Sequence, residues 1–406
     1  MMFTPPLGPP PPGARPALQT TSSCPYNIDL ELLAKRGWVS LPLEQTAEDP
    51  LYAAFSHLFS SSAQFFNLPE EERLKYKCSQ PSAQASEEGY SRVQGEKCMI
   101  TLRHAARTPT EFEMKSRAAE AWKAGGDVMR EVMGCVEESL GMEGGVLQKA
   151  MGDKVELPAE GESIVATLLR MFRYDRPVPE LSGDGEQPPS KVVAEPHKDL
   201  GLLSLVVGHT PGLECWDTKA NTWVSCEENK DGKMSATLLA GQTLAMFTNG
   251  RYSAGKHRVF VHPLAKSLPD STPDKAGATA ETFIDPDALP LLTSPAYRFS
   301  LVFTLRAHLP VRVSSSKFET AITGAFPTTA QFTDLPCEKI YKAISEAHWN
   351  VNISVEERRR QEQQIKMRSQ QAQKASNNEK SEMNSSRKRL SFAGLKNIFK
   401  RTQTVN

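Results

Sequence analysis

The sequence predicts a mainly β domain, a sandwich or barrel, flanked by helices and extended by tails. From Ser163 onward, short apolar runs alternate with turn residues roughly ten residues apart, which is the pattern of an all-β sandwich or barrel. Before that point, apolar side chains recur at helical spacing. The two ends of the chain are Pro-rich or polar, so we expect disordered N-terminal and C-terminal tails.

Composition limits the classes of partner. The chain has 406 residues, enough for one domain of about 250–300 residues with tails, or for two domains. Lys and Arg together number 48, as do Asp and Glu, so a zero formal charge predicts no nucleic-acid partner. The seven cysteines are widely spaced without a CxxC pair, which argues against a disulfide framework or a zinc knuckle.

The sequence also predicts where in the cell the protein is located. The first 16 residues lack the apolar segment of a signal peptide, and no stretch approaches about 18 apolar residues. We therefore expect a cytoplasmic protein, with nuclear access left open, that does not insert stably into membranes and is a monomer.

Four regions follow one another along the chain. Residues 1–23 form a Pro-rich leader, and residues 24–160 form a helical N-terminal region. Residues 161–350 form the β-rich domain, in which a segment rich in Pro, Asp, Thr and Ala (264–295) is predicted to be a surface insertion. Residues 351–406 form a polar and then basic amphipathic tail.

Helices are predicted before residue 160 and at the end of the β-rich domain. Apolar spacing predicts helices near 30–36 and over 48–66, a helix beginning after Pro69, and mainly helix over 109–152. Residues 335–350 are predicted to form a closing helix.

Strands are predicted wherever a short apolar run is bounded by turn residues. The first, Trp38–Leu41, precedes the β-rich domain. The others are 164–172, 202–207, 213–216, 234–239, 243–247, 259–261 and 299–305. Asn249-Gly250 predicts a hairpin turn.

A candidate metal site lies in the β-rich domain. His197 and Asp199 are two residues apart, so on a strand or at its end both side chains reach the same side. A second imidazole would complete a facial triad suited to Fe(II). We choose His257, which begins a strand after the Asn-Gly turn; His262 would face the opposite side of that strand, and His209 falls in a turn.

A candidate anion site begins the last predicted strand. Arg298 and Ser300 share one face of that strand. A buried guanidinium can hold a carboxylate through two parallel hydrogen bonds, and a neighbouring hydroxyl can add a third. The distal carboxylate of 2-oxoglutarate (2OG) would need such a site; an exposed charge at the end of a strand is the alternative.

Several motifs, in this order, resemble the isopenicillin N synthase-like branch of the 2OG/Fe(II)-dependent dioxygenases. They are Tyr174 on a strand, HKDLGLLSLVV (197–207), GLECWD (212–217), NTWVSC (221–226), GQTLAMFTNGRYSAGKHRV (241–259) and YRFSLVF (297–303). The resemblance covers residues 163–309 and extends weakly into the N-terminal region, through Gly37-Trp38-Val39 and residues 67–75.

The resemblance implies a double-stranded β-helix, or jelly roll, flanked by helices. It implies His197, Asp199 and His257 as Fe(II) ligands. Arg298 and Ser300 would anchor 2OG, and Tyr174 matches a tyrosine that often contacts the same co-substrate. With O₂ as second co-substrate, such an enzyme would hydroxylate, desaturate or cyclise a small organic metabolite, typically of specialised metabolism.

The sequence departs from the family pattern in four places. Lys198 stands where Thr or Ser is usual between the first two ligands, and Phe172 stands where plant relatives often have Asn. Gly241-Gln242 replaces a common Gly-Asp turn. The 264–295 insertion separates His257 from Arg298 more than is typical, and it would form either a lid or an outward loop.

Three other functions remain open from the sequence. A related oxidase without 2OG, as in isopenicillin N synthase, could retain Arg298 and Ser300. A catalytically silent jelly-roll binding or scaffold protein could act through its tails, and a zinc hydrolase could use the same ligands. Residues 387–402 are basic with amphipathic spacing and could bind a membrane surface or a partner weakly; a solubilising tail is the alternative.

Overall fold

The computed structural model describes most of the chain, in segments. These are residues 16–21, 24–77, 87–152, 156–177, 190–227, 234–262, 283–348, 350–368 and 370–371. The chain divides into two compact units, 1–345 and 346–406, and in the second residues 355–368 are helical. Three predictions lie outside the described residues: those for 1–15 of the leader, for 264–282 of the insertion, and for the basic segment 387–402.

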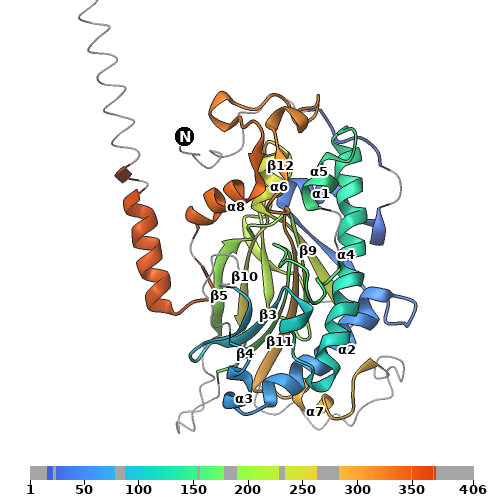
Figure 1. Ribbon diagram of the computed structural model, residues 1–406, viewed down its shortest axis with the longest axis vertical. Helices are drawn as coiled ribbons and strands as arrows, with labels where there is room; N and C mark the ends of the chain where they lie inside the picture. Colours follow the sequence, from blue (N-terminus) through green and yellow to red (C-terminus); the bar gives the residue numbers. More distant parts are fainter. Residues whose placement is uncertain are drawn as a thin grey trace, which may run out of the picture. The chain divides into compact units, whose positions relative to one another are not determined.

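The first unit is built on two antiparallel sheets (Figure 1). The major sheet has the order β1-β9-β6-β11-β4-β3-β2. In chain order its strands are β1 (Trp38–Pro42), β2 (Gly89–Val93), β3 (Lys97–Leu102), β4 (Leu168–Asp175), β6 (Leu203–Gly208), β9 (Ser235–Ala240) and β11 (Tyr297–Leu305). The minor sheet has the order β5-β10-β7-β8. It contains β5 (Lys191–Lys198), β7 (Leu213–Asp217), β8 (Thr222–Ser225) and β10 (Lys256–Val261).

Helices cover one face of the major sheet (Figure 1). The α-helices up to Glu346 are α1 (Leu30–Arg36), α2 (Pro50–Asn67), α3 (Glu70–Leu74), α4 (Met114–Ser139), α5 (Val146–Met151), α6 (Gln242–Phe247), α7 (Leu289–Leu292) and α8 (Cys337–Glu346). The long helices α2 and α4 contact the central strands on that face. A two-stranded ribbon, β12 (Arg312–Val313) with β13 (Leu335–Pro336), precedes α8. Trp122 of α4 meets Phe303 of β11 edge to face at 5.3 Å, so α4 packs directly on the sheet.

The other face of the major sheet packs against the minor sheet. Side chains alternate along each strand, so Leu301 and Phe303 join the core beneath the helices while Val302 packs into the core between the sheets. The inner core also contains Phe172 and Tyr174 of β4. Every even-numbered residue of β4 and β11 therefore points toward the minor sheet, where the candidate site lies.

The sequence predictions for the early elements are confirmed, with local causes that are visible in the structure. The carboxylate of Asp49 caps α2 by accepting the N–H groups of Leu51 and Tyr52. Gly37 ends α1 with φ +82°, a conformation that suits glycine, and β1 follows directly. The mainly β fold with flanking helices is likewise confirmed.

Two predictions were incomplete or wrong. Residues 243–247 form helix α6 rather than a strand, and Asn249-Gly250 follows that helix instead of joining two strands. Both turn residues do have positive φ, 50° and 71°. A five-residue apolar run cannot distinguish helix from strand by its period. Strands β2 and β3, which extend the major sheet, were not predicted from the sequence.

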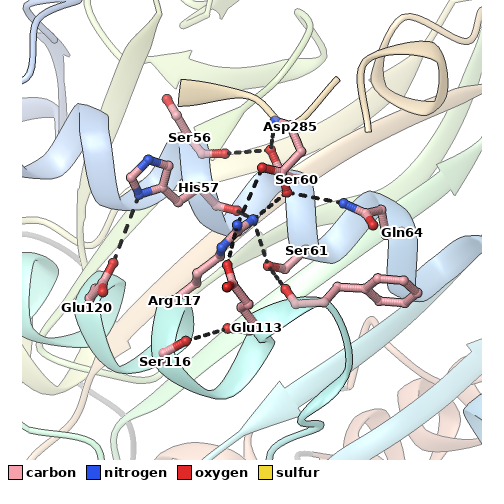
Figure 2. Close-up of polar contacts among 11 residues, drawn as sticks. Ser56, His57, Ser60, Ser61, Gln64, Glu113, Ser116, Arg117, Glu120 and Asp285 are labelled. Carbon is pink, nitrogen blue, oxygen red and sulfur yellow. Dashed lines mark hydrogen bonds and ion pairs between the residues drawn. The ribbon is translucent and has the colours of Figure 1, made fainter. Parts of the chain in front are cut away.

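The described end of the 264–295 insertion is fixed to the helices (Figure 2). Asp285 accepts a hydrogen bond of 2.7 Å from Arg117 of α4 and one of 3.2 Å from Gln64 of α2. The backbone N–H of Asp285 donates to Ser60 at 3.0 Å. This end of the insertion therefore docks on α2 and α4.

No helix among the described residues is long and apolar enough to cross a membrane.

Candidate metal and co-substrate site

The three predicted metal ligands come together at the edge of β5 and β10. These strands pair antiparallel, with His197 directly opposite His257, and Asp199 lies just beyond the end of β5. The imidazole rings are 4.2 Å apart between centroids. Asp199 Oδ1 is 3.9 Å from His197 Nε2 and 3.8 Å from His257 Nε2. One ligand atom from each residue lies within 4.8 Å of the others, which is close enough for all three to bind one ion.

Backbone carbonyl groups orient both imidazoles. Nδ1 of His197 lies 2.7 Å from the carbonyl oxygen of Glu195, and Nδ1 of His257 lies 3.2 Å from that of Gly255. A carbonyl oxygen can only accept, so each Nδ1 carries the proton. The Nε2 lone pairs are left directed at Asp199, as metal ligation requires.

The charge states also suit a metal. Burial and then the neighbouring His257 lower the pKa of His197 to about 3, so this imidazole is neutral at pH 7. Burial acts to raise the pKa of Asp199, yet His257 and His197 beside it leave that pKa below its usual value. Two imidazoles and one carboxylate are the donor set of a non-haem Fe(II) centre.

Arg298 lies on the inner face of the major sheet, opposite Tyr174 in the register of β11 and β4. Its side chain is 1% exposed, and its guanidinium carbon is 5.3 Å from the centre of the Tyr174 ring. Nε donates to the carbonyl oxygen of Thr210 at 3.0 Å, and Nη2 donates to Glu227 at 2.8 and 2.9 Å. Nη1 is buried without an acceptor among the described residues. A carboxylate of 2OG would supply that acceptor.

Ser300 and Tyr174 complete the neighbourhood of Arg298. Both are buried on the same inner face. Burial raises the pKa of Tyr174, against the opposing effects of Arg298 and a hydrogen bond with Ser300, so the phenol remains protonated. A protonated phenol and a hydroxyl can both donate to a carboxylate. The predicted co-substrate residues are thus brought together.

A family model agrees with this geometry. Residues 168–266, from β4 to beyond β10, match the model of the 2OG-Fe(II) oxygenase superfamily. Residues 168–266 belong to the 2OG-Fe(II) oxygenase superfamily. The matched region contains all three metal-ligand candidates and Tyr174. The resemblance inferred from the sequence is confirmed at the level of the superfamily, as are an Fe(II)/2OG-dependent dioxygenase activity and its cofactors.

Solved structures agree on the fold of the oxygenase. A full-length protein from Neurospora crassa in complex with alpha-KG is 17% identical, with a TM-score of 0.53, and the alignment covers 76% of this chain and 86% of that one. The complex of the same Neurospora crassa protein with alpha-KG and thymine is 16% identical, with a TM-score of 0.54, covering 77% and 88%. At this identity the likeness supports the fold alone, and it confirms the predicted jelly roll. No curated protein matches the chain in sequence.

Sequence reasoning missed Glu227, the partner of Arg298 in the oxygenase. Its carboxylate is 2% exposed, and it also accepts the backbone N–H of Leu213 at 2.8 Å. A Cβ on Gly208 would collide with both Glu227 and Arg298, and one on Gly212 would collide with Arg298. The glycines of the segment 208–212 were the available signal, because they mark a close approach of another group to the backbone.

A buried lysine was missed as well. Lys97 of β3 is 1% exposed, and its ammonium group donates to the carbonyl oxygen of Val193 in β5 at 2.9 Å. This bond joins the major sheet to the minor sheet. Because β3 itself was not predicted, no sequence pattern placed Lys97 between the sheets.

The two rejected histidines lie away from the metal ligands. His262 is exposed beside Ser190, with 2.9 Å between its Nδ1 and the hydroxyl oxygen. His209 packs against Phe59 with ring centroids 5.8 Å apart. Burial, followed by the charges of Arg298 and Arg176, lowers the pKa of His209 to about 4.

That lowered pKa predicts a loss of stability in acid. An unfolded histidine titrates near 6.5, so the contribution of His209 is complete above that pH and is lost as pH falls toward 4. Between pH 7 and pH 5 the metal-free protein should lose about 2 kcal/mol through this residue. Denaturant unfolding at both pH values should show a smaller loss for His209→Gln than for wild type. An equal loss in the two proteins would contradict the assignment.

Proposed function

We propose that this oxygenase holds Fe(II) with His197, Asp199 and His257 and anchors 2OG on Arg298, with help from Ser300 and Tyr174. The observation that carries the proposal is the convergence of three ligand atoms within 4.8 Å on the minor sheet. Support comes from the major sheet, where the inner face offers a buried guanidinium with one N–H group lacking an acceptor among the described residues.

The protein supplies binding, orientation and exclusion of water. When bound, Fe(II) and 2OG supply the oxidising chemistry, in which 2OG and O₂ yield succinate, CO₂ and one oxygen atom for the substrate. The neutral imidazoles donate their Nε2 lone pairs, and the Asp199 carboxylate offsets part of the metal charge. Nη1 of Arg298 would donate a charge-assisted hydrogen bond to the distal carboxylate of 2OG. We propose hydroxylation of a small organic metabolite as the reaction.

Finer assignments belong to the same proposal. We assign the chain to the isopenicillin N synthase-like branch, on the order of its sequence motifs, and to specialised metabolism. We further propose a cytoplasmic monomer, with nuclear access open. The proposed domains are a Pro-rich leader (1–23), an N-terminal region (24–160), a catalytic domain (161–350) and a tail (351–406).

The experiment is an anaerobic titration with Fe(II) and 2OG, followed by measurement of oxygen uptake. A weak visible absorption band should appear only when both are present. Oxygen uptake should then require 2OG and produce succinate and CO₂ in equal amounts. Uptake that is independent of 2OG would instead indicate an oxidase of the isopenicillin N synthase type. A protein that binds no Fe(II) would point to a silent scaffold.

A further inference from the structure

Three arginines lie close together at one end of the inner face of the major sheet. Arg170 is on β4, Arg103 follows β3, and Arg306 follows β11, and these three strands are neighbours in the sheet. Arg170 lies opposite Thr101 on one side and Val302 on the other. Arg170 and Arg306 occupy even-numbered positions, so they continue the inner-face rows that contain Tyr174 and Arg298.

This arginine cluster (Arg103, Arg170 and Arg306) lies beside the metal ligands. Asp199 is hydrogen-bonded to Ser204, and the Ser204 hydroxyl is 3.3 Å from that of Thr304, two residues before Arg306. The charge of Arg306 is among the causes that lower the pKa of Asp199. The cluster therefore borders the predicted metal on the side of Thr304.

The hydrogen bonds of the cluster leave one buried donor without an acceptor among the described residues. Arg306 donates to Glu87 at 2.7 Å and packs over the Tyr341 ring at 4.9 Å, yet its buried Nε has no acceptor among the described residues. Arg170 donates through Nε to the hydroxyl of Thr101 at 2.7 Å. Arg103 donates to the carbonyl oxygen of Val165 at 2.8 Å.

Glu87 is the carboxylate that contacts the cluster. Burial opposes its ionisation, but the charges of Arg306 and Arg170 lower its pKa to about 2, so it is ionised at pH 7. The carboxylate of Asp199 also acts on Arg170 and Arg306, and that of Glu88 acts on Arg103. Burial lowers the pKa of Arg103, and the charge of Arg306 lowers it further, as expected where cations crowd together in a buried site.

The distal carboxylate of 2OG, held by Arg298, lies away from Arg306. Arg306 lies eight residues beyond Arg298 (306 − 298 = 8), and a strand rises roughly 3.3 Å per residue, so the two are ~26 Å apart along the chain. The distal carboxylate on Arg298 is therefore not the acceptor for Nε of Arg306. That Nε is open to a carboxylate of another molecule bound beside the metal.

We propose that Arg170 and Arg306, with Arg103 adding positive charge, bind a carboxylate of the substrate, so that the oxygenase acts on an organic acid. The inference rests on the proposed function, because it places the substrate beside that metal site. A planar carboxylate matches the fork of a guanidinium, and the Nε of Arg306 supplies a donor already buried. Glu87 holds Nη1 of Arg306 and partly offsets the charge that attracts the substrate.

Matched acids and amides test the proposal by isothermal titration under anaerobic conditions, with Fe(II) and saturating 2OG. The probes are butanoate, octanoate and phenylacetate, each paired with its carboxamide, and phenyl phosphate. At least one acid should bind tenfold or more tightly than its amide. Preference for phenyl phosphate over all the acids would overturn the choice of a carboxylate. Equal binding of acid and amide in every pair, or no binding by any probe, would overturn the proposal.

Variants test whether Arg170 and Glu87 control the preference for acids over amides. Arg170→Gln should reduce the acid-to-amide preference tenfold or more, whereas Arg170→Lys should retain most of it. Glu87→Gln should strengthen acid binding, which a merely structural role of the cluster would not produce. Arg173→Gln is the matched control, because Arg173 is on the same strand but on its opposite face and donates to the carbonyl oxygen of Phe66. A preference retained in Arg170→Gln would contradict the assignment.

The visible band separates this inference from the proposed function. Arg170→Gln should form the band with Fe(II) and 2OG as wild type does. If the band forms while acids and amides bind alike, the substrate inference fails alone. If wild type forms no band, the proposed function fails, and acid binding to the metal-free protein still reports on the arginine cluster.

Discussion

Replacing Asp199 by Ala should lower substrate-coupled succinate formation by roughly a thousandfold or more, equivalent to about 4 kcal/mol of activation free energy. Asp199 lies 3.8–3.9 Å from both imidazole Nε2 atoms and is the anionic member of the triad. Without it, two neutral imidazoles remain, and they hold a hard divalent cation poorly. The measurements are bound Fe(II) after gel filtration and succinate produced per minute.

A matched control separates loss of the metal from general damage. His262→Gln removes an exposed histidine five residues after His257. This histidine contacts Ser190 rather than the triad. The variant should leave Fe(II) content and succinate formation unchanged. Thermal unfolding of the metal-free Asp199→Ala protein should show that it still folds. Retention of Fe(II) and activity in that variant would overturn the assignment of the metal ligands.

The metal ligands could be predicted from the sequence because their geometry is local. The spacing of His197 and Asp199 needs only a strand and its end, and His257 was chosen over its neighbours by strand register. The structure pairs His257 directly with His197, which is a long-range contact consistent with that choice. The apolar run 243–247 was wrongly predicted to be a strand, because its five residues are too few to reveal a helical period.

Partners contributed by distant segments could not be predicted in this way. Glu227 reaches Arg298 across 71 residues of sequence, and Arg306 reaches Glu87 across 219. Neither pair leaves a periodic pattern, since a buried ion pair depends on the packing of whole strands. Glycines gave a partial signal for these contacts. Gly208 and Gly212 lie where the Arg298 side chain passes close to the backbone, and a Cβ at either position would collide with it.

Replacing Arg298 by Gln should have two separate effects. Apparent affinity for 2OG should fall by roughly a hundredfold, about 3 kcal/mol, because a charge-assisted anchor for its distal carboxylate is lost. The free energy of unfolding should fall by about 3–5 kcal/mol, because Glu227 is left buried without its cation. The visible-band titration measures the first effect, and denaturant unfolding measures the second.

A double variant separates the two effects. Arg298→Gln with Glu227→Gln removes both charges, so it leaves no unpaired ion at this position in the core and should recover most of the lost stability. It should not recover affinity for 2OG, since the anchoring guanidinium is still missing. The single variant Glu227→Gln retains Nη1 of Arg298 and should still bind 2OG. Wild-type affinity for 2OG in the stable double variant would mean that the co-substrate is anchored elsewhere and that Arg298 serves the fold alone.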